Sequence, residues 1–105
     1  MEAREFVSRW RKHKDRLLTS FTDPDSTLRV AERIRALNLT DEQRDELCVV
    51  IDGVLVDTFY SLLLGLDGSG QIGGTQEMYE IRGEDGELIS SCGQIEAVAG
   101  EFFPA

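Results

Sequence analysis

The sequence is poor in the residues that most often build metal and catalytic sites. Its 105 residues include one histidine and two cysteines. Cys48 and Cys92 lack metal-ligand spacing to each other or to His13, and no serine or cysteine is fixed as a nucleophile beside that histidine. We therefore expect no metal, no cofactor and no enzymatic activity. Two cysteines also make no disulfide framework.

Basic residues are scarce in the later part of the chain. Residues 1–35 hold nine basic and six acidic residues, whereas residues 36–105 hold two basic and fourteen acidic residues. The two balances, +3 and −12, sum to the net charge of −9. A surface this acidic repels nucleic acid and attracts basic proteins. We expect no nucleic-acid binding and a protein partner with a basic surface.

The N-terminus lacks the apolar stretch of a signal peptide, since it reads MEAREFVSRWRKHK. One long apolar run, residues 47–66, contains Asp52 and Asp57, each of which costs about 2.5–3.5 kcal/mol near the centre of a membrane helix. The run therefore predicts a buried helix rather than a membrane span. These features favour a cytoplasmic protein with reduced cysteines.

The first predicted helix covers residues 2–19. Apolar residues recur along one side of it at helical spacing. The basic residues between positions 9 and 14 fall mostly off this stripe, so we expect them to be solvated. The stripe comprises Phe6, Trp10, His13, Leu17 and Phe21, with Val7 and Leu18 beside it.

Two more helices are predicted before the first glycine-rich segment. The second begins at Asp23-Pro24, a favoured N-cap followed by a proline at the first helical position, and Asn38 closes it in a left-handed conformation. The third opens with a capping box, T-D-E-Q at residues 40–43, and ends near Gly65. Its apolar part has no polar face, so we expect it to form the centre of the fold.

A β-hairpin and a last helix complete the prediction. Residues 76–82 and 87–90 read as strands joined by a turn at residues 84–86. A second capping box, S-C-G-Q at residues 91–94, opens the final helix. This helix should bury Ile95, Val98, Ala99 and Phe102. The predicted fold class is α+β and mainly helical, with three N-terminal helices, one β-hairpin and a C-terminal helix in a single domain over residues 1–105.

Asp57 is the polar residue of the apolar run that most needs an explanation. Gly53, Asp57, Ser61 and Gly65 recur every four residues and so share one ridge of the helix. A buried carboxylate there needs hydrogen bonds or an arginine, because an unpaired buried charge is strongly unfavourable. Two interpretations stay open: a structural Asp57 satisfied by its neighbours, or a site residue beneath the glycine-rich loop of residues 65–74.

The sequence D-G-S-G-Q-I resembles the middle of an EF-hand calcium loop. Asp67, Ser69 and Gln71 take the places of loop positions 3, 5 and 7. The first ligand position falls on Gly65 and the twelfth on Gln76, neither of which is acidic, and a strand follows instead of a helix. We therefore expect no calcium site. The same loop can instead cradle an anion through its backbone N–H groups.

The leading functional hypothesis is protein–protein binding through the acids of the hairpin. Small acidic bacterial immunity proteins mask basic partners in this way, and the likeness rests on size and charge alone. The expected contact residues are Glu77, Glu80, Glu84, Asp85 and Glu87. The alternative is small-molecule or anion binding in a pocket formed by Asp57, Ser61 and the loop of residues 65–74. Edge pairing of two hairpins into a homodimer is compatible with both.

Overall fold

The computed structural model describes residues 1–104. The elements in chain order are α1 (Ala3–Thr22), α2 (Arg29–Ala36), α3 (Asp41–Asp67), β1 (Ile81–Arg82), β2 (Leu88–Ser90) and α4 (Glu96–Phe102). Three N-terminal helices, one antiparallel hairpin and a C-terminal helix confirm the predicted mainly helical α+β fold.

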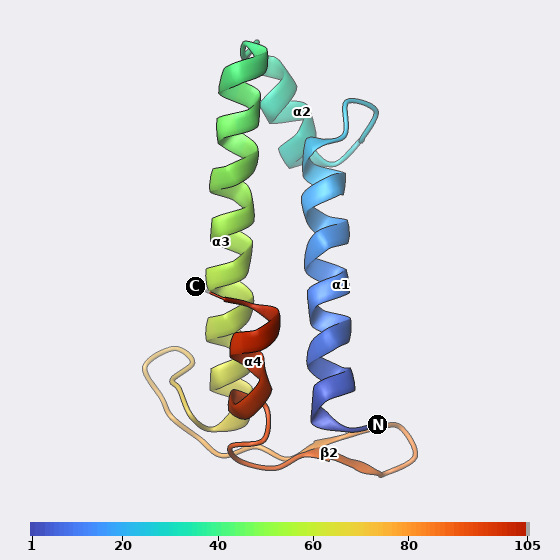
Figure 1. Cartoon of the computed structure of the whole chain (residues 1–105), viewed down its shortest axis with the longest axis vertical. Coiled ribbons are helices and arrows are strands. Elements are labelled where there is room, and N and C mark those ends of the chain that lie inside the picture. The colour runs from blue at the N-terminus through green and yellow to red at the C-terminus, as the bar shows by residue number, and fades with distance from the viewer. Residues whose placement is uncertain (105) are drawn as a thin grey trace.

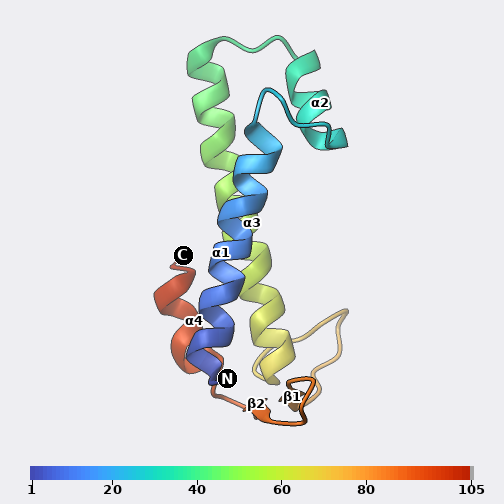
Figure 2. The same ribbon diagram turned by 90° about the vertical axis from the view of Figure 1, so that its right-hand side faces the viewer.

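Two long antiparallel helices, α1 and α3, form the body of the molecule, which measures 46 × 29 × 23 Å (Figure 1). The short helices α2 and α4 lie on opposite sides of this pair, α2 near one end and α4 toward the other (Figure 2). The hairpin runs below the end of the pair that α4 covers (Figure 1). We call this the lower end, and the end at α2 the upper end.

α2 begins at Arg29, later than the cap predicted at Asp23-Pro24. Asp23 instead closes a turn, because its Oδ1 accepts a hydrogen bond of 2.9 Å from the backbone N–H of Asp25. Side-chain bonds of this kind compete with helical hydrogen bonding. The other end of α2 is as predicted, since Asn38 takes a left-handed conformation with φ 52°.

α3 opens with the predicted capping box. Thr40 Oγ1 accepts a hydrogen bond of 3.2 Å from the N–H of Gln43, and the Gln43 side chain accepts one of 3.0 Å from the N–H of Thr40. The helix passes Gly65 and ends at Asp67. Gly68 is the residue that takes the left-handed conformation, φ 81°, and it ends the helix as a glycine commonly does.

The two strands are shorter than predicted. Ile81 pairs with Ser90 and Arg82 with Leu88 in an antiparallel register that shifts between the two pairs. Residues 76–80, predicted as part of the first strand, form no strand.

The turn between the strands is held by its own polar groups. Gly86, with φ 83°, donates its N–H to the carbonyl oxygen of Gly83 over 3.0 Å. Asp85 Oδ1 accepts a hydrogen bond of 3.0 Å from the N–H of Glu87. These contacts confirm the predicted hairpin turn.

The hydrophobic core lies at the lower end, where α1, α3 and α4 meet. Its buried members are Val7, Leu63, Ile95, Ala99 and Phe103. The buried side of α1 is therefore centred on Val7, beside the predicted stripe, and Phe6 and Trp10 of the stripe pack against the core. His13 of that stripe is exposed, and its ring stacks on Phe59 with 6.2 Å between centroids.

Lys14 is also buried, which corrects the expectation that the basic residues of the first helix are all solvated. Its Nζ atom lies 2.7 Å from Asp15 Oδ1 and 2.6 Å from Asp52 Oδ1. Burial alone would lower the pKa of Lys14, but hydrogen bonds to both carboxylates and their charges raise the pKa above its ordinary value. Asp52, the first acid of the apolar run, thus links α3 to α1.

α3 is apolar around most of its circumference, yet its own chain covers little of it. All three of its buried residues lie at or after Leu63. In the upper half Val50 and Val54 are 57% and 59% exposed. The prediction that residues 47–66 form the buried centre of the fold is therefore wrong for this half. The reason is that α4 reaches only the lower end.

Candidate functional site

Asp67 is a buried carboxylate, with 1% of its surface exposed. Its oxygens accept hydrogen bonds of 3.1 Å from the backbone N–H groups of Ile95 and Glu96, and the hydroxyl of Ser69 donates to it over 2.9 Å. Those N–H groups begin α4, where a carboxylate satisfies free donors and suits the helix dipole. Asp67 therefore fastens the end of α3 to the start of α4.

The glycine-rich loop after α3 packs on itself. Gln76 donates its side-chain N–H to the carbonyl oxygen of Gly68 over 2.7 Å. The side chain of Ile72 lies so close to Gly65 that a Cβ atom there would overlap it. Gln71 is exposed. Of the three side chains that resemble calcium ligands, two, Asp67 and Ser69, are thus bonded to each other inside the fold.

Asp57 and Ser61 are both exposed, so the prediction of a buried Asp57 is wrong. The ridge is open to solvent from Gly53 to Ser61, where a Cβ atom at Gly53 would meet no atom within 4 Å, and it becomes buried only at Gly65. Ten residues separate Asp57 from Asp67, which is about 15 Å along the helix axis. The structure does not bring Asp57 to the loop. Five grooves of residues 1–104 are lined neither by Asp57 nor by the loop of residues 65–74.

The five acids predicted to contact a partner lie on the loop and hairpin at the lower end, and all are exposed. Glu80 pairs with Arg82 over 3.0 Å, and Glu87 pairs with the N-terminal amine over 3.0 Å. The other three form no ion pair with any residue from 1 to 104: Glu77, Glu84 and Asp85.

Two large side chains stand exposed among these acids. Met78 is 74% exposed and Tyr79 is 39% exposed. The negative charge of Glu77 raises the pKa of Tyr79 above its ordinary value, with desolvation and a hydrogen bond acting in the same direction. The Tyr79 hydroxyl, like any phenol, is a hydrogen-bond donor at neutral pH. Exposed Met and Tyr side chains within a polar rim are typical of protein interfaces.

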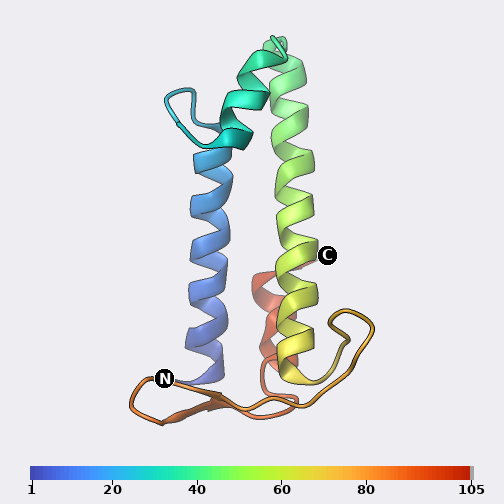
Figure 3. The same ribbon diagram turned by 180° about the vertical axis from the view of Figure 1, so that it is seen from behind.

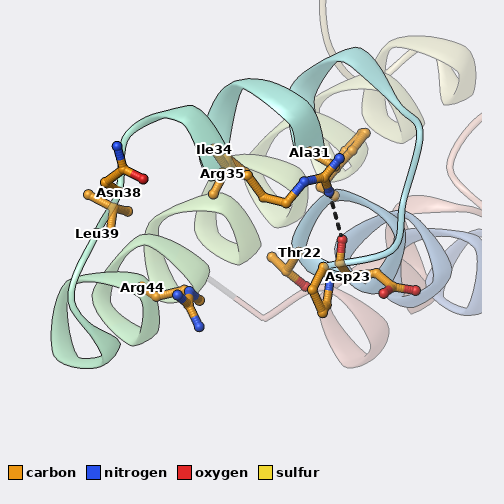
Figure 4. Close-up of a pocket in the computed structure, with 10 residues that line it drawn as sticks. Thr22, Asp23, Ala31, Ile34, Arg35, Asn38, Leu39 and Arg44 are labelled. Carbon is orange, nitrogen blue, oxygen red and sulfur yellow. Dashed lines mark hydrogen bonds between the residues drawn. The ribbon is translucent and has the colours of Figure 1, made fainter.

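A separate groove lies at the upper end, between the end of α1, α2 and the start of α3 (Figure 4). Arg35 donates to the backbone oxygens of Asp23 over 3.3 Å and of Ser26 over 2.7 Å. Arg44, on the opposite wall, pairs with Asp41 over 3.6 Å. Both guanidinium groups thus have partners within the chain. The hydrogen bonds of Arg35 hold the connection between α1 and α2 against α2.

Residues with metal-binding or nucleophilic side chains are scattered. Within residues 1–104, no three His, Cys, Asp or Glu side chains are grouped to hold a metal ion. Cys48 is half-buried and Cys92 is exposed, and neither is in a disulfide.

Comparison of the chain with protein-family models, with curated proteins and with solved structures finds no match. Among the described residues, α3 alone is long and apolar enough to cross a membrane by length and composition, and 6% of its most apolar window is buried.

The sequence does not predict two structural roles, namely that of Asp67 at the start of α4 and that of Lys14 between α1 and α3. Gln94 does accept a hydrogen bond of 2.9 Å from the N–H of Ser91, as a capping box requires, but α4 begins later and its first donors go to Asp67. The second role is the ion pair between Lys14 and Asp52. A signal for it exists, since Asp52 interrupts an apolar helix and therefore requires a basic partner.

Proposed function

We propose that the protein is a non-enzymatic cytoplasmic interaction module that binds a basic protein partner through an acidic surface at its lower end. This acidic surface comprises Glu77, Met78, Tyr79, Glu84 and Asp85. The observation that carries the proposal is the side chain of Met78, which is 74% exposed and directly follows Glu77, a carboxylate with no ion pair within residues 1–104.

The charge and the apolar side chains act at different stages of binding. Unpaired acids attract a basic partner from a distance and raise the association rate. Met78 and Tyr79 then provide contact area that loses little on burial, because both are largely solvated already and Met adapts its shape to a partner. A partner with lysines or arginines around a shallow apolar depression fits this surface, as in the masking of a basic active site.

Small-molecule binding at Asp57 and the glycine-rich loop has weaker support. Asp57 is exposed on a helix face, while the Asp67 carboxylate is occupied by α4.

Photo-cross-linking tests the proposal. A photoreactive amino acid is placed at position 78 and, as a matched control, at the exposed position Arg16 of α1. After irradiation in cells, we expect position 78 to capture a basic protein that position 16 does not. The triple variant Glu77→Gln, Glu84→Gln, Asp85→Asn should reduce that adduct strongly. Identical adducts at both positions, or an adduct that survives the triple substitution, would contradict the proposal.

A further inference from the structure

One face of the α1–α3 pair carries an apolar groove at its lower part. Its walls include Phe6, Trp10, His13, Phe59, Leu62 and Ile89. Arg4 and Arg11 of α1 contact α4 through Glu101 and the carbonyl oxygen of Phe102, and they lie on the other side of α1. The groove is therefore on the face that α4 leaves free.

A second apolar groove lies between α2 and α3 at the upper end. Its apolar walls include Val30, Ile34, Leu37, Leu47 and Ile51. Val30 and Leu37 are 46% and 61% exposed. Two arginines, Arg29 and Arg33, form its polar rim.

The two grooves lie on one stripe of α3. Leu47, Ile51 and Leu55 follow at intervals of four residues, and Leu62 comes seven residues later, so all four side chains share a side of the helix. Seen from behind, no element crosses α1 and α3 between α2 and the hairpin (Figure 3). We call this stripe with its two grooves the uncovered face.

We propose that a second copy of this chain packs on the uncovered face, forming a two-fold symmetric helical dimer in which the upper half of each α3 meets the other copy. In such a contact each copy supplies both the groove and what fills it. Large contiguous apolar patches on a protein surface mark interaction sites. The upper half of α3 offers Val50 and Val54 as exposed apolar side chains to fill a groove.

Charge identifies the second copy as the occupant. Arg29 and Arg33 on the groove rim form no ion pair within residues 1–104. Glu46 and Asp57, which flank the exposed valines of α3, likewise have no ion pair among those residues. An apolar groove with an arginine rim is complementary to an apolar helix that has acidic residues at its edges. The upper half of α3 in a second copy is such a helix.

A lipid bilayer fits the same face poorly. α1 lies along α3 and is tied to it by Lys14, which is hydrogen-bonded to Asp52 over 2.6 Å (Figure 1). Inserting α3 would carry the charged side chains of α1 into the hydrocarbon, where each is strongly unfavourable. Asp57 would also enter the membrane without a partner. The lower groove adjoins part of the acidic surface, because the hollow lined by Glu84 and Asp85 shares Ile89 with it, whereas Met78 lines neither.

Sedimentation velocity of the intact protein tests the dimer. We expect a mass of 23.6 kDa, twice the 11.8 kDa of one chain, at micromolar concentration. Val30→Glu and Leu62→Glu place a charge in the upper and lower groove, and each should give the monomer mass. Both positions are at least 40% exposed, so helical circular dichroism should be unchanged. The control Met78→Glu, in the segment before β1 and outside both grooves, should remain dimeric.

A charge-reversal pair tests which surfaces meet. Variant one carries Arg29→Glu and Arg33→Glu, and variant two carries Glu46→Lys and Asp57→Lys. Each should be monomeric alone because like charges oppose one another at the contact. An equimolar mixture should give a heterodimer, since every reversed charge then meets its opposite.

Three outcomes would overturn the proposal. One is a wild-type protein that stays at 11.8 kDa at high micromolar concentration, whether or not it binds phosphatidylserine vesicles. Another is a dimer that Val30→Glu and Leu62→Glu leave intact, which would place the contact elsewhere, for example at the hairpin edge. The third is a mixture of the two charge variants that remains monomeric.

Discussion

The ammonium nitrogen of Lys14 lies 2.6 Å from Oδ1 of Asp52, although only 3% of the Lys14 side chain is exposed. This ion pair joins the two long helices above the hydrophobic core. The carboxylates of Asp52 and Asp15 remain 44% and 52% exposed, so water still solvates the acidic partners. The buried charge is therefore that of the lysine, and it depends on both acids.

Removing the charges of both Asp15 and Asp52 should destabilise the fold more than removing either charge alone. The double variant Asp15→Asn, Asp52→Asn leaves Lys14 buried without a counter-charge, which costs about 3–5 kcal/mol. Lys14→Met, which removes the buried charge itself, should change the unfolding free energy by about 1 kcal/mol or less, because an apolar side chain of similar volume suits the site. Urea unfolding of the wild type, Asp15→Asn, Asp52→Asn, the double variant and Lys14→Met measures these differences. Equal losses in the double variant and in Lys14→Met would contradict the assignment.

The same cluster makes stability depend on pH at both extremes. The hydrogen bond from Lys14 lowers the pKa of Asp15 below its ordinary 3.8, so its contribution is present above that value and is lost as pH falls through the lowered pKa. The pKa of Lys14 is raised above 10.5, so its contribution is complete below 10.5 and is lost as pH rises through the raised pKa. Thermal melts across pH should show Asp15→Asn losing less stability than the wild type in acid. A parallel acid loss in both proteins would contradict this.

Asp67→Ala should destabilise the lower end of the molecule. The change leaves the N–H groups of Ile95 and Glu96 without their acceptor, at a cost of about 2–4 kcal/mol. Asp67→Asn retains one acceptor oxygen and should cost less. Ser69→Ala removes only a donor to the carboxylate and serves as the control, with an expected loss of about 1 kcal/mol. Chemical unfolding ranks the three variants, and an Asp67→Ala protein as stable as Ser69→Ala would refute the capping role.

Two glycines of α3 and its cap should respond oppositely to alanine. Gly68 has φ 81°, and a Cβ atom there would lie 3.1 Å from the Met78 Cα atom, so Gly68→Ala should cost at least about 1–2 kcal/mol. Gly53 is helical and open around its Cβ position, so Gly53→Ala should stabilise the protein by about 0.5–1 kcal/mol. Differential scanning calorimetry gives both values. A stabilising Gly68→Ala would show that the left-handed cap is not maintained.

Local signals in the sequence were sufficient for the helices and the turn. The capping box of Thr40 and Gln43 and the left-handed Asn38 depend on neighbouring residues, and both are found as predicted. Asp23-Pro24 misled because the same aspartate can cap a turn or a helix. The strand expected at residues 76–80 failed because a short hairpin has few cross-strand contacts to hold it.

The candidate site was harder to predict because burial depends on tertiary packing. The apolar run of α3 indicates a helix that needs covering, but it does not tell whether the same chain or another supplies the cover. The apolar residues around Asp57 predict a buried carboxylate, but Asp57 is exposed. Asp67 was placed among ligand residues, whereas its partners are N–H groups of Ile95 and Glu96, far away in sequence.

The fluorescence of Trp10 tests most directly whether the uncovered face is an interface. It is the sole tryptophan of the chain, and it lines the lower groove. Dilution of the wild type from high micromolar to nanomolar concentration should shift its emission to longer wavelength as the second copy leaves, while Leu62→Glu should show the long-wavelength emission throughout. An emission maximum that is independent of concentration and equal in the two proteins would contradict the account.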